Sequence, residues 1–297
     1  GHEDCTSKFH SIVDNIILRM QPAEDYVVIV TGDIVENANH SGFTDDAVAA
    51  FGRLEDNGFQ MLVIPGNHDY GTGILGNDKF IDIFKERFFG TTAIEYPKLD
   101  IIDGVAFIGL DSTAEELHWF DRILSQGELG REQLNRLGRL LDDKSIAHLQ
   151  KVVYLHHHPF DFKPGMRLKD SDDLKPIIEN RIEMILFGHY HADPSSPGKT
   201  YHGKWGIRRC YNAGSSTHKN DSVGFHRVID LEFDDPAMDY DGGIISGRRA
   251  QGAGESSFPL FIIRFYDFFQ KGYCCFYTLI LIQFCAFIFD IDISFET

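Results

Sequence analysis

Four apolar segments of this chain each end directly at a cluster of polar residues. The segments are short and show no alternation of apolar and polar residues, which is typical of strands covered on both faces. In an open α/β sheet, ligands bind in the crevice beyond the carboxyl ends of the strands. We therefore expect the four clusters to converge in space. The segments and clusters are 26–31 before Gly32-Asp33, 61–65 before Gly66-Asn67-His68-Asp69, 152–155 before His156-His157-His158-Pro159, and 183–187 before Gly188-His189-Tyr190-His191.

Helical patterns alternate with these segments. Apolar residues recur at i, i+3, i+4 and i+7 from Phe9 to Met20, which places them on one face of a helix. Alternating strands and helices predict an α/β protein whose helices cover the faces of the sheet. The other predicted helices are 44–57, 78–88 and 131–141, and the other predicted strands are 105–110, 208–211 and 227–233.

The polar clusters supply oxygen and nitrogen ligands and no thiolate. Asp33 offers a carboxylate and Asn67 an amide oxygen, and this kind of set suits iron, manganese or zinc rather than calcium or a structural zinc. A carboxylate can bridge two cations, and a metal pair about 3.5 to 4 Å apart activates a water and holds the oxygens of a phosphoryl displacement. The sequence therefore predicts the hydrolysis of phosphate esters. The candidate imidazole ligands are His157, His189 and His191.

Each cluster, taken alone, also has a purely structural explanation. Gly-Asp and Gly-Asn form turns after strands for backbone reasons. Alternation along an extended segment would point His156 and His158 away from the site of His157, so core or supporting roles are expected for both. What favours a functional site is that all the clusters follow strands in the same structural context.

At these residues the chain resembles the calcineurin-like metallophosphoesterase family, and within it the small phosphodiesterases that act on cyclic nucleotides and related esters. The family pattern is Asp-x-His, Gly-Asp, Gly-Asn-His-Asp/Glu, a His two residues before a Pro, and Gly-His-x-His. Four of these five blocks occur here in order. The resemblance covers roughly residues 7–233 and implies an α/β fold of the four-layer αββα type, in which two sheets pack face to face with helices outside.

The resemblance also implies a role for each matching residue. Asp33 would bridge two metal ions, and His191 would reach the first of them. His68 would stabilise the transition state or protonate the leaving oxygen, with Asp69 orienting its ring. The nucleophile would be a hydroxide activated by the two metal ions. The residues that would complete the second metal site are Asn67, His157 and His189.

The first block of the family pattern, Asp-x-His, finds no match. His2-Glu3-Asp4 has the residue order reversed, and only Gly1 precedes it. We therefore expect a strand and two ligands upstream of Gly1, so that the domain is N-terminally truncated and its first metal site lacks two ligands. The alternative is a relative that has lost catalysis and acts as an interaction module.

The composition of the chain changes after residue 238. Residues 239–257 are rich in Gly, Ser and Arg and are predicted to be a linker. Residues 258–297 are dense in Phe, Ile and Leu, and the uncharged run 272–289 has the minimum length that spans a bilayer. We expect a metallophosphoesterase domain over 1–238 and then a hydrophobic tail. The tail is a membrane anchor, a docked extension or a sequence that does not naturally continue the gene product.

The charge and the cysteines limit the partners and the compartment. With 45 acidic and 28 basic residues the formal net charge is −17, which repels a polyanion. The expected substrate is therefore a small phosphate ester, a phosphodiester first and a phosphomonoester second, and a nucleic acid polymer is disfavoured. The five cysteines show no paired CxxC spacing and no even framework. This favours a reducing compartment, the cytoplasm, with membrane association if the tail is an anchor.

Overall fold

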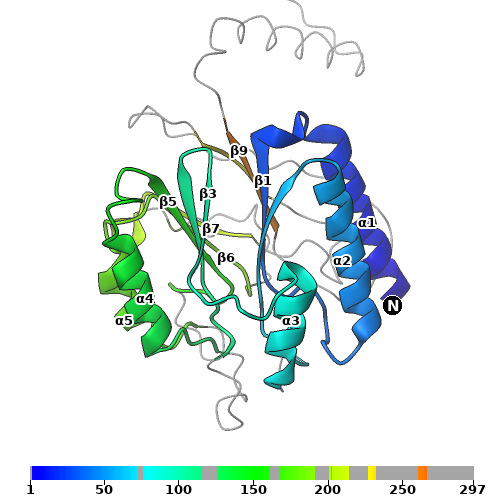
Figure 1. Ribbon diagram of the computed structural model, residues 1–297, viewed down its shortest axis with the longest axis horizontal. Helices are drawn as coiled ribbons and strands as arrows, with labels where there is room; N and C mark the ends of the chain where they lie inside the picture. The colour runs from blue at the N-terminus through cyan, green and yellow to red at the C-terminus, as the bar shows by residue number, and fades with distance from the viewer. Residues whose placement is uncertain are drawn as a thin grey trace, which may run out of the picture.

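Two β-sheets face each other and carry helices on their outer faces (Figure 1). The computed structural model describes residues 2–72, 76–114, 126–160, 167–190, 201, 203–213, 227–231 and 260–265. In this part of the chain the α-helices are α1 (His2–Arg19), α2 (Ser41–Asp56), α3 (Lys79–Phe89), α4 (Arg131–Leu141) and α5 (Ser171–Ile178). Helices α1, α2 and α3 cover one sheet, and α4 and α5 cover the other. The predicted four-layer αββα sandwich is confirmed.

The first sheet has the strand order β2-β1-β9-β8, and the second has the order β3-β4-β5-β6-β7. Strands β1 and β2 are parallel, and so are β4, β5, β6 and β7. The strands of the first sheet are β1 (Tyr26–Thr31), β2 (Gln60–Ile64), β8 (Arg227–Leu231) and β9 (Leu260–Phe265). Those of the second are β3 (Lys98–Ile102), β4 (Val105–Gly109), β5 (Gln150–Leu155), β6 (Met184–Phe187) and β7 (Arg209–Asn212).

The buried side chains of β1 alternate between two cores. Val27 and Ile29 belong to the core between the sheets, whereas Val28 and Val30 belong to the core under α1, α2 and α3. This explains why the strand is apolar at every position, because both of its faces are covered. A third core lies between α4, α5 and the second sheet.

Strand β9 corrects the predicted domain boundary. Residues 258–297 were expected to lie outside the domain, but Leu260–Phe265 pair antiparallel with β1 and parallel with β8. Ile262 and Ile263 are fully buried in the two cores on either side of the sheet. The predicted end of the domain at residue 238 therefore leaves out a strand, because the chain returns to the sheet at residue 260. The predicted linker 239–257 and the uncharged run 272–289 lie outside the described residues.

No helix in the described part of the chain combines the length and the apolar character that a membrane span requires.

Candidate metal centre

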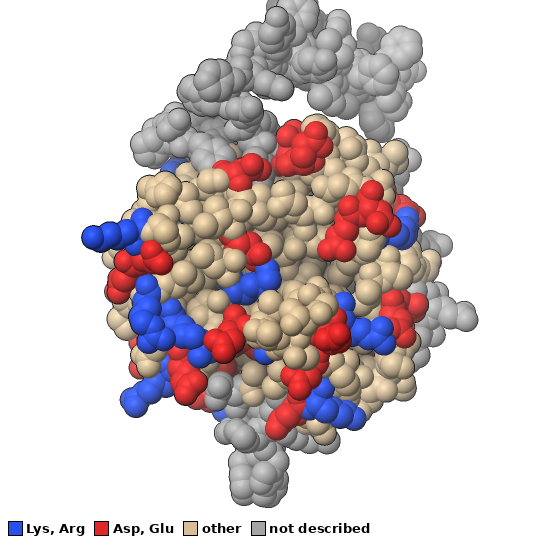
Figure 2. Space-filling model, in the orientation of Figure 1, with Lys and Arg blue, Asp and Glu red and all other residues tan. Residues whose placement is uncertain are grey.

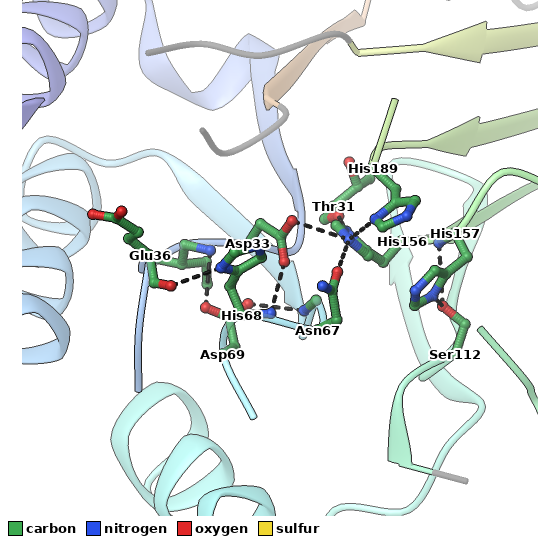
Figure 3. Close-up of polar contacts among 12 residues, drawn as sticks. Thr31, Asp33, Glu36, Asn67, His68, Asp69, Ser112, His156, His157 and His189 are labelled. Atoms are coloured by element: carbon green, nitrogen blue, oxygen red, sulfur yellow. Dashed lines mark hydrogen bonds and ion pairs between the residues drawn. The ribbon is translucent and has the colours of Figure 1, made fainter. Parts of the chain in front are cut away.

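The loops that follow four parallel strands bring the candidate ligands together (Figure 3). Asp33 follows β1 and Asn67 follows β2, so both come from the first sheet. His157 follows β5 and His189 follows β6, so both come from the second sheet. The centre of the group is His156, whose Nε2 lies 3.0 Å from Asn67 Oδ1, 3.1 Å from His189 Nδ1 and 3.2 Å from Asp33 Oδ2. The site is therefore shared between the two sheets.

Oxygen and nitrogen atoms of three residues converge on one nitrogen of His156. His156 Nδ1 lies 2.7 Å from the carbonyl oxygen of Thr31, which can only accept, so Nδ1 carries a proton and donates it. A neutral ring then has no proton on Nε2, although two acceptor oxygens, from Asp33 and Asn67, face that atom. Burial alone would lower the pKa of His156, but the charge of Asp33 raises it, and an imidazolium supplies one proton for both oxygens. A buried set of converging lone pairs of this kind fits a metal cation.

His157 completes the cluster of imidazoles. Its ring centroid lies 4.6 Å from that of His189 and 4.9 Å from that of His156. One ligand atom from each of these three residues lies within 4.8 Å of the other two. Burial, together with the charges of His189 and His156, lowers the pKa of His157 well below its usual value, so the ring is neutral. A neutral imidazole is the form that binds a metal.

Asp33 is an ionised, buried carboxylate in a strained position. Burial alone would raise the pKa of Asp33, but the nearby charges of His156 and His68 hold it well below its usual range. Its Oδ1 accepts a hydrogen bond of 3.0 Å from the backbone N–H of His68. The φ angle is 52° at Asp33 and 62° at His189, in the left-handed region that few residues other than glycine adopt. Such strain is concentrated at functional sites.

The contacts of Asp69 differ from the expected ones. Its carboxylate accepts hydrogen bonds from the backbone N–H groups of Ile34, Val35 and Gly66, at 2.9, 3.1 and 2.8 Å. Burial and the charge of Asp33 raise the pKa of Asp69 to about 7. Asp69 therefore joins the loops after β1 and β2, and the expectation that it orients the ring of His68 does not hold.

His68 is held by a different group. Its Nδ1 lies 2.6 Å from the carbonyl oxygen of Glu36, which can only accept, so Nδ1–H is the donor. The ring is only partly buried. This arrangement leaves Nε2 as the nitrogen that can exchange a proton with a bound molecule.

The two histidines that flank His157 differ from each other. His158 lies in the core as expected, with its ring centroid 4.5 Å from that of Phe187 and 4.8 Å from that of Tyr201. His156 was expected to point away from the site, and this was wrong, because β5 ends at Leu155 and the alternation of the strand does not continue beyond it. The remaining candidate ligand, His191, lies outside the described residues.

The loop after β4 also contributes to the site, although it was not among the predicted clusters. Ser112 Oγ lies 2.8 Å from His157 Nδ1, and Asp111 Oδ2 accepts a hydrogen bond of 2.8 Å from the hydroxyl of Tyr70. The Tyr70 contact joins the loop that carries Asn67 to the loop that carries Ser112. The apolar run 105–110 before Asp111 is the same signal as in the other clusters, so it could have identified both residues.

Replacing Gly66 with alanine is expected to destabilise the folded protein by about 1 to 3 kcal/mol, because inserted carbon atoms force a packed site to shift. A Cβ at Gly66 would lie 2.3 Å from both the backbone nitrogen and Oδ1 of Asp33. Chemical denaturation would measure the change. Gly138→Ala is the matched control, because Gly138 lies in α4 with nothing within 4 Å of its Cβ position. That variant should gain about 0.5 to 1 kcal/mol. Equal stability of the two variants would contradict the close approach of Gly66 to Asp33.

A sequence model of the calcineurin-like phosphoesterase family matches residues 2–193. This range is more than half of the chain and contains Asp33, Asn67 and all the histidines of the cluster. A search of curated proteins finds no match.

Proposed function

The chain belongs to the calcineurin-like phosphoesterase family, and on that basis we propose that it hydrolyses small phosphodiesters of the cyclic-nucleotide type with two bound metal ions. Family membership and the cluster of His156, His157 and His189 support metal-dependent hydrolysis of phosphate esters in general. The observation that carries the proposal is the set of oxygen and nitrogen atoms that converges around His156 Nε2.

Some residues of the site would bind the metal ions, and others would donate protons or hold the loops in place. Asp33, Asn67, His157 and His189 would hold one ion, and Asp33 with His191 would contribute to the other. The bound ions, of manganese, iron or zinc, would polarise the phosphate and lower the pKa of a water.

Three side chains would attract the cations, supply a proton and hold the loop of the site. Asp33 stays ionised because of its low pKa, so it presents a permanent negative charge to cations. His68 donates Nδ1–H to Glu36, and when the ring is an imidazolium its Nε2–H would stabilise the phosphate or pass to the leaving oxygen. Asp69 would keep the loop of His68 in place through its three backbone contacts.

The charge of the protein favours a diester over a monoester. A phosphodiester carries one negative charge, whereas a phosphomonoester carries about 1.5 to 2 at pH 7. The net charge of −17 opposes the approach of the more highly charged ester. On the face seen in Figure 2, Lys and Arg side chains lie among Asp and Glu side chains and form no basic stripe. A nucleic acid polymer would need such a stripe to bind.

The test is hydrolysis of a nitrophenyl phosphodiester and of the matching monoester in the presence of Mn²⁺. Asn67→Ala and His157→Ala should each reduce the rate at least about 100-fold, a loss comparable to removing one group that stabilises the transition state. His148→Ala, at an exposed position, is the control and should match the wild type.

Three outcomes separate the hypotheses. Retained activity in both Asn67→Ala and His157→Ala would refute the ligand assignment. Faster turnover of the monoester would reverse the order of the substrates. Binding of Mn²⁺ without turnover of either ester would favour the non-catalytic interaction module. Metal analysis adds a further check: the second ion has only Asp33 and His191 as candidate ligands, so we expect one ion to bind tightly and the other weakly.

A further inference from the structure

Ser112 contacts a candidate metal ligand in two places. Its side chain is fully buried, and its Oγ lies 2.8 Å from Nδ1 of His157. The same oxygen accepts a hydrogen bond of 3.2 Å from the backbone N–H of His157. One hydroxyl thus contacts both the ring and the backbone of one residue.

The backbone around Ser112 is fixed by hydrogen bonds. The N–H of Asp111 donates to Oε1 of Gln133 at 2.9 Å, and Nε2 of Gln133 donates to the carbonyl oxygen of Asp111 at 2.6 Å. The carbonyl oxygen of Ser112 accepts from the N–H of Glu128 at 3.0 Å. These bonds hold Oγ of Ser112 at one place relative to β4.

The backbone of Gly127 lies directly against the ring of His157. A Cβ at Gly127 would be 2.2 Å from Nδ1 and 2.3 Å from Cγ of His157. Hydrogen bonds to Arg167 and Lys169, of 3.2 and 2.7 Å, hold the backbone of Gly127. The ring of His157 therefore has little room to turn away from Ser112.

We propose that Ser112 is a positioning residue that determines which ring nitrogen of His157 is available to a metal ion. A neutral imidazole has one donor and one acceptor nitrogen. When Nδ1–H donates to Ser112, Nε2 keeps its lone pair. That atom is buried and has no hydrogen-bond partner among the residues that the structure describes. Residues that accept the second N–H of a ligating histidine fix its tautomer and ring orientation.

The test compares the Mn²⁺ affinity of Ser112→Ala with that of Thr113→Val. Each metal-free protein is titrated with Mn²⁺ in a calorimeter. Ser112→Ala should weaken Mn²⁺ binding about 10- to 100-fold, the loss typical of removing such an outer partner. Thr113→Val is the matched control. Thr113 follows Ser112 directly in the sequence, and its hydroxyl is also buried. That hydroxyl has no hydrogen-bond partner in the described part of the chain. The control should bind Mn²⁺ as the wild type does.

A second readout follows the tautomer itself. Nitrogen NMR of the imidazole should show Nδ1 protonated in the wild type and a mixture of tautomers in Ser112→Ala, whereas a role in packing alone would leave the tautomer unchanged. Ser112→Cys keeps the size of the side chain with a weaker hydrogen-bonding group, and it replaces Ser112→Ala if that variant does not fold. Unchanged Mn²⁺ affinity in the variant used, or equal losses in it and in Thr113→Val, would overturn the proposal.

The role of Ser112 rests on the proposed function. One further variant distinguishes a failure of the proposed metal ligands from a failure of the role of Ser112 alone. His157→Ala should weaken Mn²⁺ binding at least as much as Ser112→Ala does. If His157→Ala leaves the affinity unchanged, the proposed ligand set fails. If His157→Ala weakens binding and Ser112→Ala does not, only the role of Ser112 fails.

Discussion

Asp33→Asn is expected to reduce phosphoester hydrolysis to the rate that remains after a chelator has removed the metal. Asp33 is the carboxylate of the cluster, and its low pKa keeps it charged. The amide retains the size of the side chain and an oxygen for the N–H of His68, but it loses the negative charge that a cation needs. The loss should exceed the roughly 10- to 100-fold cost of removing a residue that only supports a ligand. Hydrolysis assays and Mn²⁺ calorimetry would measure it.

The control for Asp33→Asn is Asp172→Asn, which removes an exposed carboxylate from α5. It should leave both activity and Mn²⁺ affinity unchanged. Chemical denaturation of the metal-free proteins would show whether Asp33→Asn remains folded. A folded Asp33→Asn protein that binds Mn²⁺ like the wild type would show that the cluster is not a metal site.

Ile263→Ala is expected to destabilise the protein by about 2 to 5 kcal/mol, the usual cost of truncating a fully buried isoleucine. Ile263 lies in β9, opposite Val27 of β1 and Ile229 of β8, and it belongs to the core between the sheets. Deleting its side chain leaves a cavity at the centre of the sandwich. Denaturation with urea, analysed for the midpoint and slope, would measure the change.

Ile101→Ala provides the matched comparison. Ile101 lies on β3, at the edge of the second sheet, and its side chain is 56% exposed. Its truncation should change stability by less than about 0.5 kcal/mol. Similar effects of the two substitutions would mean that residues 260–265 do not form part of the sheet.

The sequence predicts every strand that the structure describes except β3 and β9. The predicted strand 26–31 coincides with β1, the prediction 61–65 is displaced by one residue from β2, and the prediction 183–187 begins one residue before β6. Strand β3 was missed because it is an edge strand, with a Lys98–Asp100 ion pair on one face. Strand β9 was missed because its apolar run continues into the residues after it, and no local pattern shows that it pairs with a strand more than 200 residues earlier.

The sequence also predicts which residues meet but not how their side chains are directed. Polar clusters at the carboxyl ends of parallel strands had to lie at the same edge of the sheets, and the structure brings Asp33, Asn67 and His189 together. The direction of His156 depends on its bond to Thr31, which lies 125 positions away in the sequence. Contacts between such distant loops leave no periodic signal in the sequence.

The positive φ angles of Asp33 and His189 carry a conformational cost. A residue with a Cβ in the left-handed region costs about 1 kcal/mol, and Asp and His are among the residues that tolerate it best. Glycine would adopt the same angles without that cost. Replacing either residue with glycine would relieve this strain and would also remove a carboxylate or an imidazole from the cluster around His156. Backbone strain and the donor set of the candidate site are therefore tied to the same two positions.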